Sequence, residues 1–212
     1  MTTLYAKDLS LKDVHRVLGF QRGYNSSFTP LLSLESLTDF EQQELEQIRE
    51  DFDNYLIDGE VSEGQVKLLA IAPLLRLAGF YRSPLKISLE ENISRITIDD
   101  EDTSITGRLD ILAVNKQRQI TANTSSFWVL VIESKNSQVN ALAGLAQLLT
   151  YTYNNLEHQE SIWGLATNGM HYQFVYIQSE NPPTYQLLPF LNLMEAESSM
   201  QVLRVLKAIR QL

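Results

Sequence analysis

The ten residues from Phe127 to Asn136 decide the fold of this chain, and they read Phe-Trp-Val-Leu-Val-Ile-Glu-Ser-Lys-Asn. Six bulky apolar residues run directly into Glu133, Ser134 and Lys135, and this predicts a buried central strand. Because strand side chains alternate between faces, Glu133 and Lys135 emerge on the same side at the end of that strand. A buried charge is costly unless it is paired, so this acid and base indicate either a structural salt bridge or a metal site with a catalytic lysine.

The composition of the 212-residue chain is that of an ordinary globular protein, with 44% hydrophobic and 20% charged residues. No apolar run is long enough to span a bilayer, and residues 1–10 lack the layout of a signal peptide. We therefore expect a cytoplasmic protein without a membrane partner. Cysteine is absent and the three histidines are scattered, so any metal would be held by oxygen, which favours Mg²⁺ or Mn²⁺.

The net charge of −9 argues against a simple electrostatic binder of nucleic acid. The acidity is uneven, however. Residues 1–64 hold 13 acidic and 5 basic side chains, whereas residues 65–212 hold 13 acidic and 12 basic ones. The basic residues, Lys86 and Lys116 among them, are dispersed along the sequence and form no basic run.

Residues 1–60 predict an N-terminal helical extension, with helices over about residues 8–20 and from residue 36 or 38 to 56. Residues 61–212 predict the main domain. Its first helix is expected over about Ser62–Leu77, where Ser62 can cap the start, Pro73 should kink the middle and Gly79 can end it.

The rest of the chain predicts strands and helices in alternation. Strands are expected at Leu85–Leu89, which the apolar residues at 93, 96 and 98 can extend, and at Ile105–Val114, with an acidic turn over residues 99–102 between them. Beyond the central strand we expect a helix over residues 138–155, a hairpin of strands 161–167 and 171–177 around Asn168-Gly169, and a closing helix over residues 195–212. This order predicts an α/β fold, a central mixed β-sheet flanked by helices.

Asp110 lies in the middle of the strand expected at residues 105–114. If that strand and the central strand pair as an antiparallel hairpin, the carboxylates of Asp110 and Glu133 can approach each other on one face. Together with the backbone carbonyl of Ser134 they supply enough oxygen ligands for a hard divalent cation. Lys135 can then orient or deprotonate a metal-activated water, or stabilise negative charge on a phosphate undergoing attack. This is the chemistry of phosphodiester hydrolysis.

The helix that follows carries a polar stripe of small and uncharged residues. Asn140, Gly144, Gln147 and Tyr151 are spaced four, three and four residues apart, so they share one helix face. A face of this kind suits a groove for a phosphate backbone, because amide and phenol groups position a substrate without attracting it by net charge.

These residues together resemble the PD-(D/E)xK nuclease superfamily, which has the restriction endonuclease-like fold. Asp110 followed by Glu133-Ser134-Lys135 is similar to its metal-site motif, and Gln147 to Tyr151 is similar to the QxxxY motif of its RecB-like branch. The helix before the sheet and the run Ala166–Gly169 resemble the N-terminal nuclease domain of type I restriction enzyme R subunits. The resemblance covers about residues 61–178, and Leu109 stands before Asp110 where Pro is common in the superfamily.

The resemblance implies roles for individual residues. Asp110 and Glu133 would bind Mg²⁺ or Mn²⁺, Lys135 would assist the water, and Gln147 and Tyr151 would contact the DNA backbone. A glutamate of the first helix often joins the site in this family, which would place Glu63 there. The positive end of the helix dipole also accounts for an acid at that position, so both interpretations of Glu63 stay open.

Two functions from different classes follow. The first is a metal-dependent nuclease that hydrolyses DNA phosphodiester bonds in restriction or repair. Because cutting both strands of a duplex usually needs two such sites, we also expect a homodimer. The alternative is a catalytically inactive nuclease-fold module that binds nucleic acid or protein, which the acidic charge favours. Residues 59–64 have the glycine spacing of a phosphate loop, but no Lys-Ser/Thr follows, so we expect no nucleotide cofactor.

Overall fold

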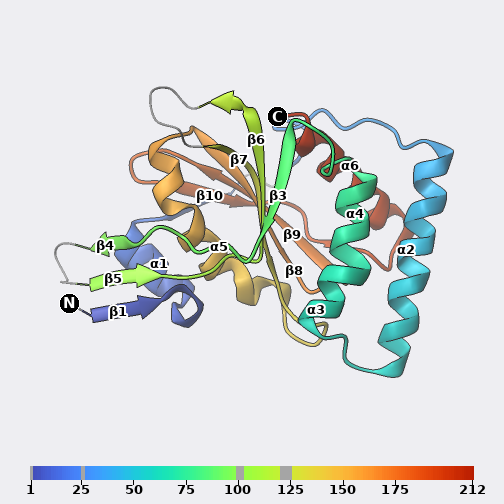
Figure 1. Ribbon diagram of the computed structural model, residues 1–212, viewed down its shortest axis with the longest axis horizontal. Coiled ribbons are helices and arrows are strands. Elements are labelled where there is room, and N and C mark those ends of the chain that lie inside the picture. Colours follow the sequence, from blue (N-terminus) through green and yellow to red (C-terminus); the bar gives the residue numbers. More distant parts are fainter. Residues whose placement is uncertain (1, 25–26, 99–102, 120–125) are drawn as a thin grey trace.

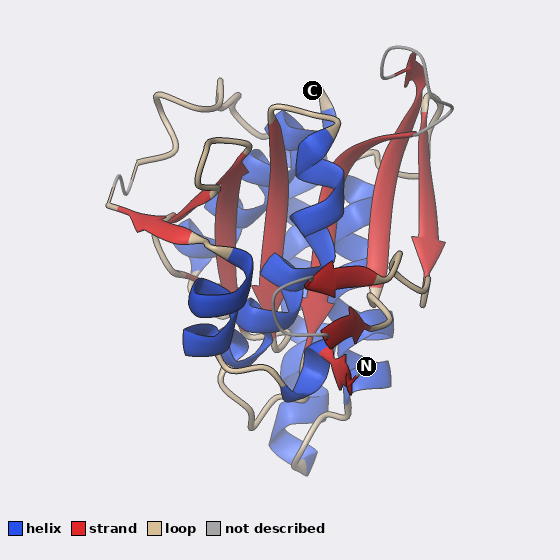
Figure 2. Cartoon of the chain, turned by 90° about the vertical axis from the view of Figure 1, so that its left-hand side faces the viewer, coloured by secondary structure: helices blue, strands red, loops and turns tan. Residues whose placement is uncertain are grey.

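The protein is built in three layers, with a mixed sheet between two sets of helices (Figure 1). The structure, a computed structural model, describes residues 2–24, 27–98, 103–119 and 126–212. Helices α2 (Asp39–Asp58), α4 (Ala72–Leu77) and α6 (Ala196–Arg210) cover one face of the sheet, and α1 (Leu11–Leu18) and α5 (Leu145–Thr152) cover the other. Figure 2 shows helices both in front of and behind the strands. The expected mixed sheet flanked by helices is therefore confirmed.

The predicted central strand lies inside the large sheet, between an antiparallel and a parallel neighbour. In the described part of the chain this sheet has eight strands, seven of them in the order β2–β10–β9–β8–β7–β6–β3, with β11 (Leu191–Asn192) paired to β9. In that order their bounds are Gln21–Gly23, Thr184–Leu187, His171–Gln178, Ser161–Thr167, Ser126–Ser134, Ile111–Gln119 and Leu85–Leu89. Strand β7 pairs antiparallel with β6 and parallel with β8. The crossover from β7 to β8 runs through η4 (Ala141–Gly144), α5 and η5 (Tyr153–Glu157), as parallel strands require.

The strand expected at Ile105–Val114 is broken, and this expectation was wrong. Its first part belongs to β5 (Thr103–Thr106), which lies between β1 (Thr2–Tyr5) and β4 (Ile96–Ile98) in a separate small sheet. Gly107 lies in the break and is closely packed, because a Cβ there would lie 2.8 Å from Cε1 of Tyr151 and 2.9 Å from Cβ of Ala6. The apolar residues at 96 and 98 belong to β4 and so do not extend β3. The acidic turn expected at residues 99–102 lies outside the described residues.

Residues 1–60 contain both expected helices, each started by a capping box. Ser10 and Asp13 form the box of α1, and Thr38 and Glu41 form that of α2. The segment is not purely helical, however, because β1 pairs with β5 and β2 pairs with β10. Short strands with little apolar alternation leave no periodic signal in the sequence. The division of the chain at residue 60 stays a prediction.

The first helix of the main domain has a wide turn in its middle. Ser62 caps α3 (Glu63–Val66), a π-helical turn η2 spans Lys67–Ile71, and α4 follows. The backbone N–H of Ala72 donates to the carbonyl of Lys67, five residues earlier. Pro73 lacks an N–H and its ring crowds the preceding turn, so a local widening is the expected response. Gly79, at φ +87°, ends the helix as predicted.

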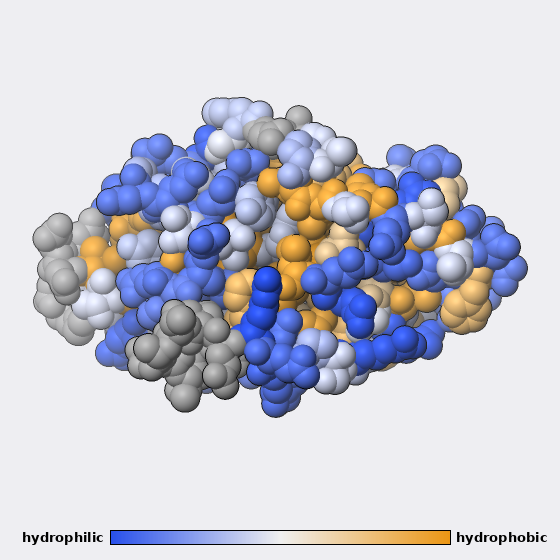
Figure 3. Space-filling model, turned by 90° about the horizontal axis from the view of Figure 1, so that it is seen from above, coloured by the Kyte–Doolittle hydropathy of each residue, from blue (hydrophilic) through white to orange (hydrophobic). Residues whose placement is uncertain are grey.

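The apolar core is divided by the sheet into two clusters, one beneath each set of helices. Seen from above, most of the surface is hydrophilic and apolar residues gather near the middle (Figure 3). No helix in the described part of the chain combines the length and hydropathy needed to cross a bilayer.

Gly164 of β8 is required by close packing against α5, and we predict that Gly164→Ala destabilises the fold. A Cβ at this position would lie 2.4 Å from Cδ2 of Leu148, which is fully buried. Overpacking of this kind costs about 1–3 kcal/mol of unfolding free energy, measurable by urea denaturation. The matched control is Gly64→Ala in α3, where a Cβ meets nothing within 4 Å and the variant should be at least as stable as the wild type. Equal stability of the two variants would contradict this account.

Candidate functional site

One cavity of about 590 Å³ collects the site residues that the sequence predicted. Asp110, Glu133, Lys135, Gln147 and Tyr151 all line it, and so does Glu63 at its rim. The strands β6 and β7, helix α5 and the start of α3 therefore meet at this point.

Asp110 immediately precedes β6 and is held by the end of β7. Its Oδ2 accepts hydrogen bonds from the backbone N–H of Ser134 at 2.7 Å and from the Ser134 hydroxyl at 2.8 Å. The antiparallel pairing of Ile111 with Ile132 brings these two strand ends together. The side chain of Asp110 is 15% exposed, so it faces the cavity from a fixed position.

Glu133 is the most deeply buried acid of the site, with a side chain that is 3% exposed. Its Oε1 accepts a hydrogen bond from Nζ of Lys135 at 2.6 Å, whereas its Oε2 is buried and has no hydrogen-bond partner among the described residues. Burial, followed by the charge of Asp110, raises the pKa of Glu133 to about 7, although Lys135 acts in the opposite direction. Gly144 leaves room for this side chain, since a Cβ there would lie 2.7 Å from Cγ of Glu133.

A chain of hydrogen bonds links Lys135 to helix α5. Nζ of Lys135 donates to Oε1 of Gln147 at 2.8 Å, and Nε2 of Gln147 donates to the hydroxyl of Tyr151 at 3.0 Å. Burial raises the pKa of Tyr151 well above its usual value, so its hydroxyl stays protonated at neutral pH. Of the four residues on the predicted polar face, Gln147 and Tyr151 reach the cavity, whereas Asn140 caps η4 by accepting from the N–H of Leu142.

Lys67 belongs to the site, although it was not among the residues predicted from the sequence. Its Nζ donates to Oδ1 of Asp110 at 2.8 Å and to Oε1 of Glu63 at 2.9 Å. Burial by itself would lower the pKa of Lys67. The hydrogen bonds and negative charges of Asp110 and Glu63 outweigh that effect and raise the pKa, so the side chain is protonated at neutral pH. The contact between Lys67 and Glu63 could have been predicted from the sequence, because residues four apart on a helix lie next to each other. The contact between Lys67 and Asp110 has no such signal.

Ser134 acts on Asp110 through its N–H and hydroxyl, a contact that the sequence did not reveal. The role expected for its backbone carbonyl, as a metal ligand, stays a prediction.

The donor atoms of the site fit a hard divalent cation. Carboxylate oxygens of Asp110 and Glu133 and the carbonyl of Ser134 are the ligand types that Mg²⁺ and Mn²⁺ take. The partnerless Oε2 of Glu133 is a buried acceptor that a cation would satisfy. Within the described residues, no three acidic or histidine side chains are already arranged as a metal-binding group. The carboxylates are instead turned toward lysine ammonium groups.

No protein-family model matches the chain, and no curated protein matches it either. Among solved structures, the chain is similar to a fragment of a putative HsdR subunit of a type I restriction enzyme from Vibrio vulnificus YJ016. The two are 16% identical with a TM-score of 0.41, and the match covers 68% of this chain and 26% of that one. This chain thus matches about a quarter of the length of that structure.

The raised pKa of Glu133 predicts a loss of stability with rising pH in protein kept free of divalent cations by a chelator. The folded state holds the proton more tightly than the unfolded state, so this contribution is complete below about pH 4.5 and disappears as the pH rises to about 7. A shift of this size corresponds to on the order of 3 kcal/mol. Urea denaturation between pH 4.5 and 7.5 should show this loss in the wild type and lack it in Glu133→Gln. Parallel pH curves for the two proteins would refute the assignment.

Proposed function

We propose that this chain is a metal-dependent nuclease that hydrolyses DNA phosphodiester bonds, of the PD-(D/E)xK kind, acting in restriction or repair. The observation that carries the proposal is the convergence of Asp110, Glu133 and Lys135 on one cavity. Gln147 accepts a hydrogen bond from Lys135 and donates one to Tyr151. These residues come from three elements that are separate in the sequence.

Asp110, Glu133 and the backbone carbonyl of Ser134 would hold Mg²⁺ or Mn²⁺, with Glu63 as a further ligand at the rim. When bound, the ion would supply a Lewis acid and a water of lowered pKa. Support for this comes from the buried, partnerless Oε2 of Glu133 and from the three acidic groups that line one cavity.

Lys135 would stabilise the negative charge that develops on the phosphate. Its ammonium group is held between Glu133 and Gln147 and its side chain is 20% exposed, so the remaining N–H can point into the cavity. Gln147, whose amide also donates to Tyr151, would fix the position of this lysine and, with Tyr151, contact the DNA backbone.

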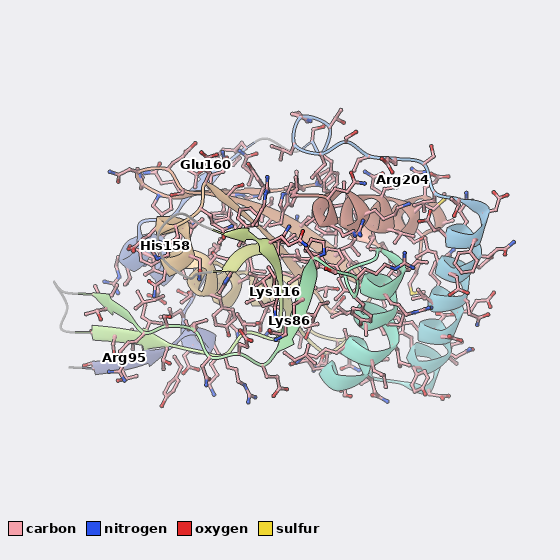
Figure 4. The ribbon with its side chains drawn as sticks, turned by 45° about the horizontal axis from the view of Figure 1, so that its top comes forward. Lys86, Arg95, Lys116, His158, Glu160 and Arg204 are labelled. Carbon is pink, nitrogen blue, oxygen red and sulfur yellow. The ribbon has the colours of Figure 1, made fainter. Side chains whose placement is uncertain are left out.

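A basic pair beside the site supports DNA as the substrate. Lys86 of β3 is paired with Val114 of β6, and the exposed Lys116 follows two residues later, where its backbone N–H donates to the carbonyl of Pro84, just ahead of β3. Figure 4 shows the two side by side on their neighbouring strands. At about 3.4 Å per residue, the position opposite Lys86 lies roughly 14 Å along the strand from Asp110, and Lys116 lies beyond it. Both lysines lie in the same direction from Asp110 along the strand, so the pair would contact phosphates on one side of the reacting one.

The alternative is a nuclease-fold module that binds nucleic acid or protein without cleaving it. One observation favours it: Oδ1 of Asp110 and Oε1 of Glu133 already have lysine partners. A homodimer, which would present two sites to a duplex, is proposed together with the nuclease.

The proposal predicts cleavage of plasmid or linear DNA by the wild type in Mg²⁺ or Mn²⁺ and its loss with a chelator. Asp110→Asn and Lys135→Met should each lower the rate at least about 100-fold, because each removes a charge that acts in the transition state. Gel electrophoresis of the products measures this, and Lys12→Met on α1 serves as the control. Binding of DNA without cleavage by the wild type, on every substrate tried, would favour the inactive module instead.

The basic pair predicts a selective loss of DNA affinity. Lys86→Gln and Lys116→Gln should each weaken binding and reduce the salt dependence of the binding constant by about one ion, whereas the exposed Lys12→Gln should not. Fluorescence anisotropy of labelled DNA at several salt concentrations measures both quantities. Equal effects of the three substitutions would show that the pair has no special role.

A further inference from the structure

Lys67 donates a hydrogen bond to Oδ1 of Asp110, one of the oxygens that would hold a metal ion. We propose that Lys67 is a built-in counter-ion that competes with the metal ion, so that the metal binds only when Lys67 leaves Asp110. This inference rests on the proposed function, because it concerns the same metal site.

The contacts of Asp110 leave little room for a second cation. Its Oδ2 already accepts two hydrogen bonds from Ser134, and its Oδ1 accepts the hydrogen bond from Nζ of Lys67 at 2.8 Å. A hard cation binds a carboxylate oxygen at about 2.0–2.2 Å, so at Oδ1 it would stand close to the ammonium group. Two positive charges at that separation repel each other strongly in a partly buried site.

Lys135 does not block the metal in the same way. It binds only Oε1 of Glu133 and leaves Oε2 without a partner, so Glu133 keeps a free oxygen for a cation. Asp110 has no corresponding free oxygen while Lys67 is bound. The competition therefore belongs to Lys67 and not to both lysines of the site.

The position of Lys67 in the fold allows it to move. Its side chain is 24% exposed and its flexible stem starts from the π-helical turn η2, whereas Asp110 belongs to a different element, the residue ahead of β6. The ammonium group can leave Asp110 by rotation of the side chain alone. While it stays, it holds Glu63 and Asp110 together and offsets their mutual repulsion.

The test is Mn²⁺ binding by the full chain, measured by isothermal titration calorimetry without DNA. Lys67→Gln removes the charge but keeps a hydrogen-bond donor, and it should bind Mn²⁺ about tenfold more tightly than the wild type, a difference of about 1.4 kcal/mol. The matched control is Lys7→Gln, because Lys7 lines the cavity that holds Asp110 and its ammonium lies over the Tyr5 ring, 5.9 Å from the centroid. Its affinity should stay within about twofold of the wild type, since a lost charge that frees no carboxylate oxygen has a small effect at an exposed position.

Unchanged or weaker Mn²⁺ binding by Lys67→Gln would overturn the inference, and so would an equal gain in Lys7→Gln, which would reveal a general charge effect. A second measurement uses the wild type alone and so does not depend on the folding of a variant. Acetylation of Lys67, followed by mass spectrometry, should become several-fold faster when Mn²⁺ is added, relative to Lys7 as the internal reference. An unchanged ratio would overturn the inference.

The outcomes separate this inference from the proposed function. Mn²⁺ binding and DNA cleavage by the wild type, with no gain in Lys67→Gln, would remove only the role of Lys67. Absence of Mn²⁺ binding in all three proteins would remove the metal site, and with it both proposals.

Discussion

The carboxylates of Glu63, Asp110 and Glu133 line one cavity, and ion pairs with two lysines offset their mutual repulsion. Lys67 bridges Glu63 and Asp110, and Lys135 pairs with Glu133 at 2.6 Å. Acids this close repel one another, and burying them without a cation is costly. The lysines offset that cost only in part, since the pKa of Glu133 is still raised to about 7 and one of its oxygens has no partner. The arrangement is thus one that an additional cation would stabilise.

The scaffold around these charges depends on close approaches of the backbone. Gly144 lets the start of the α5 region lie against Glu133, and Gly107 lets the chain pass Tyr151 and break between β5 and β6. Because of that break, Asp110 lies just before β6 and not inside a strand. In this position both of its carboxylate oxygens accept hydrogen bonds from neighbouring elements. The wide turn before Pro73 starts at Lys67, the residue that faces Asp110. Irregular backbone therefore lies on two sides of the site.

Much of the fold follows from local patterns in the sequence. The apolar run before Glu133 forms the central strand, Ser62 caps the first helix of the main domain, and Gly79 ends it. Such features depend on residues within a few positions of one another. The pairing of β1 with β5 had no comparable signal, because two strands about one hundred residues apart leave no periodicity that identifies them as partners. The strand break at Gly107 was missed for the same reason, since the crowding side chains of Ala6 and Tyr151 are distant in sequence.

The sequence by itself determined which chemical groups the protein carries and most of the elements that carry them: an acid and a lysine at the end of the central strand, and an amide and a phenol one turn apart on the next helix. It placed Asp110 inside a strand, whereas the structure places it just before β6. Periodicity and residue chemistry are local, so they can be read without coordinates. Only the tertiary structure decided which charges meet. It joined Lys67 to Asp110 across 43 residues and Ser134 to Asp110 across 24, and it brought the dispersed Lys86 and Lys116 onto neighbouring strands. The reason is physical: electrostatic contact depends on distance in space, and strand register sets that distance.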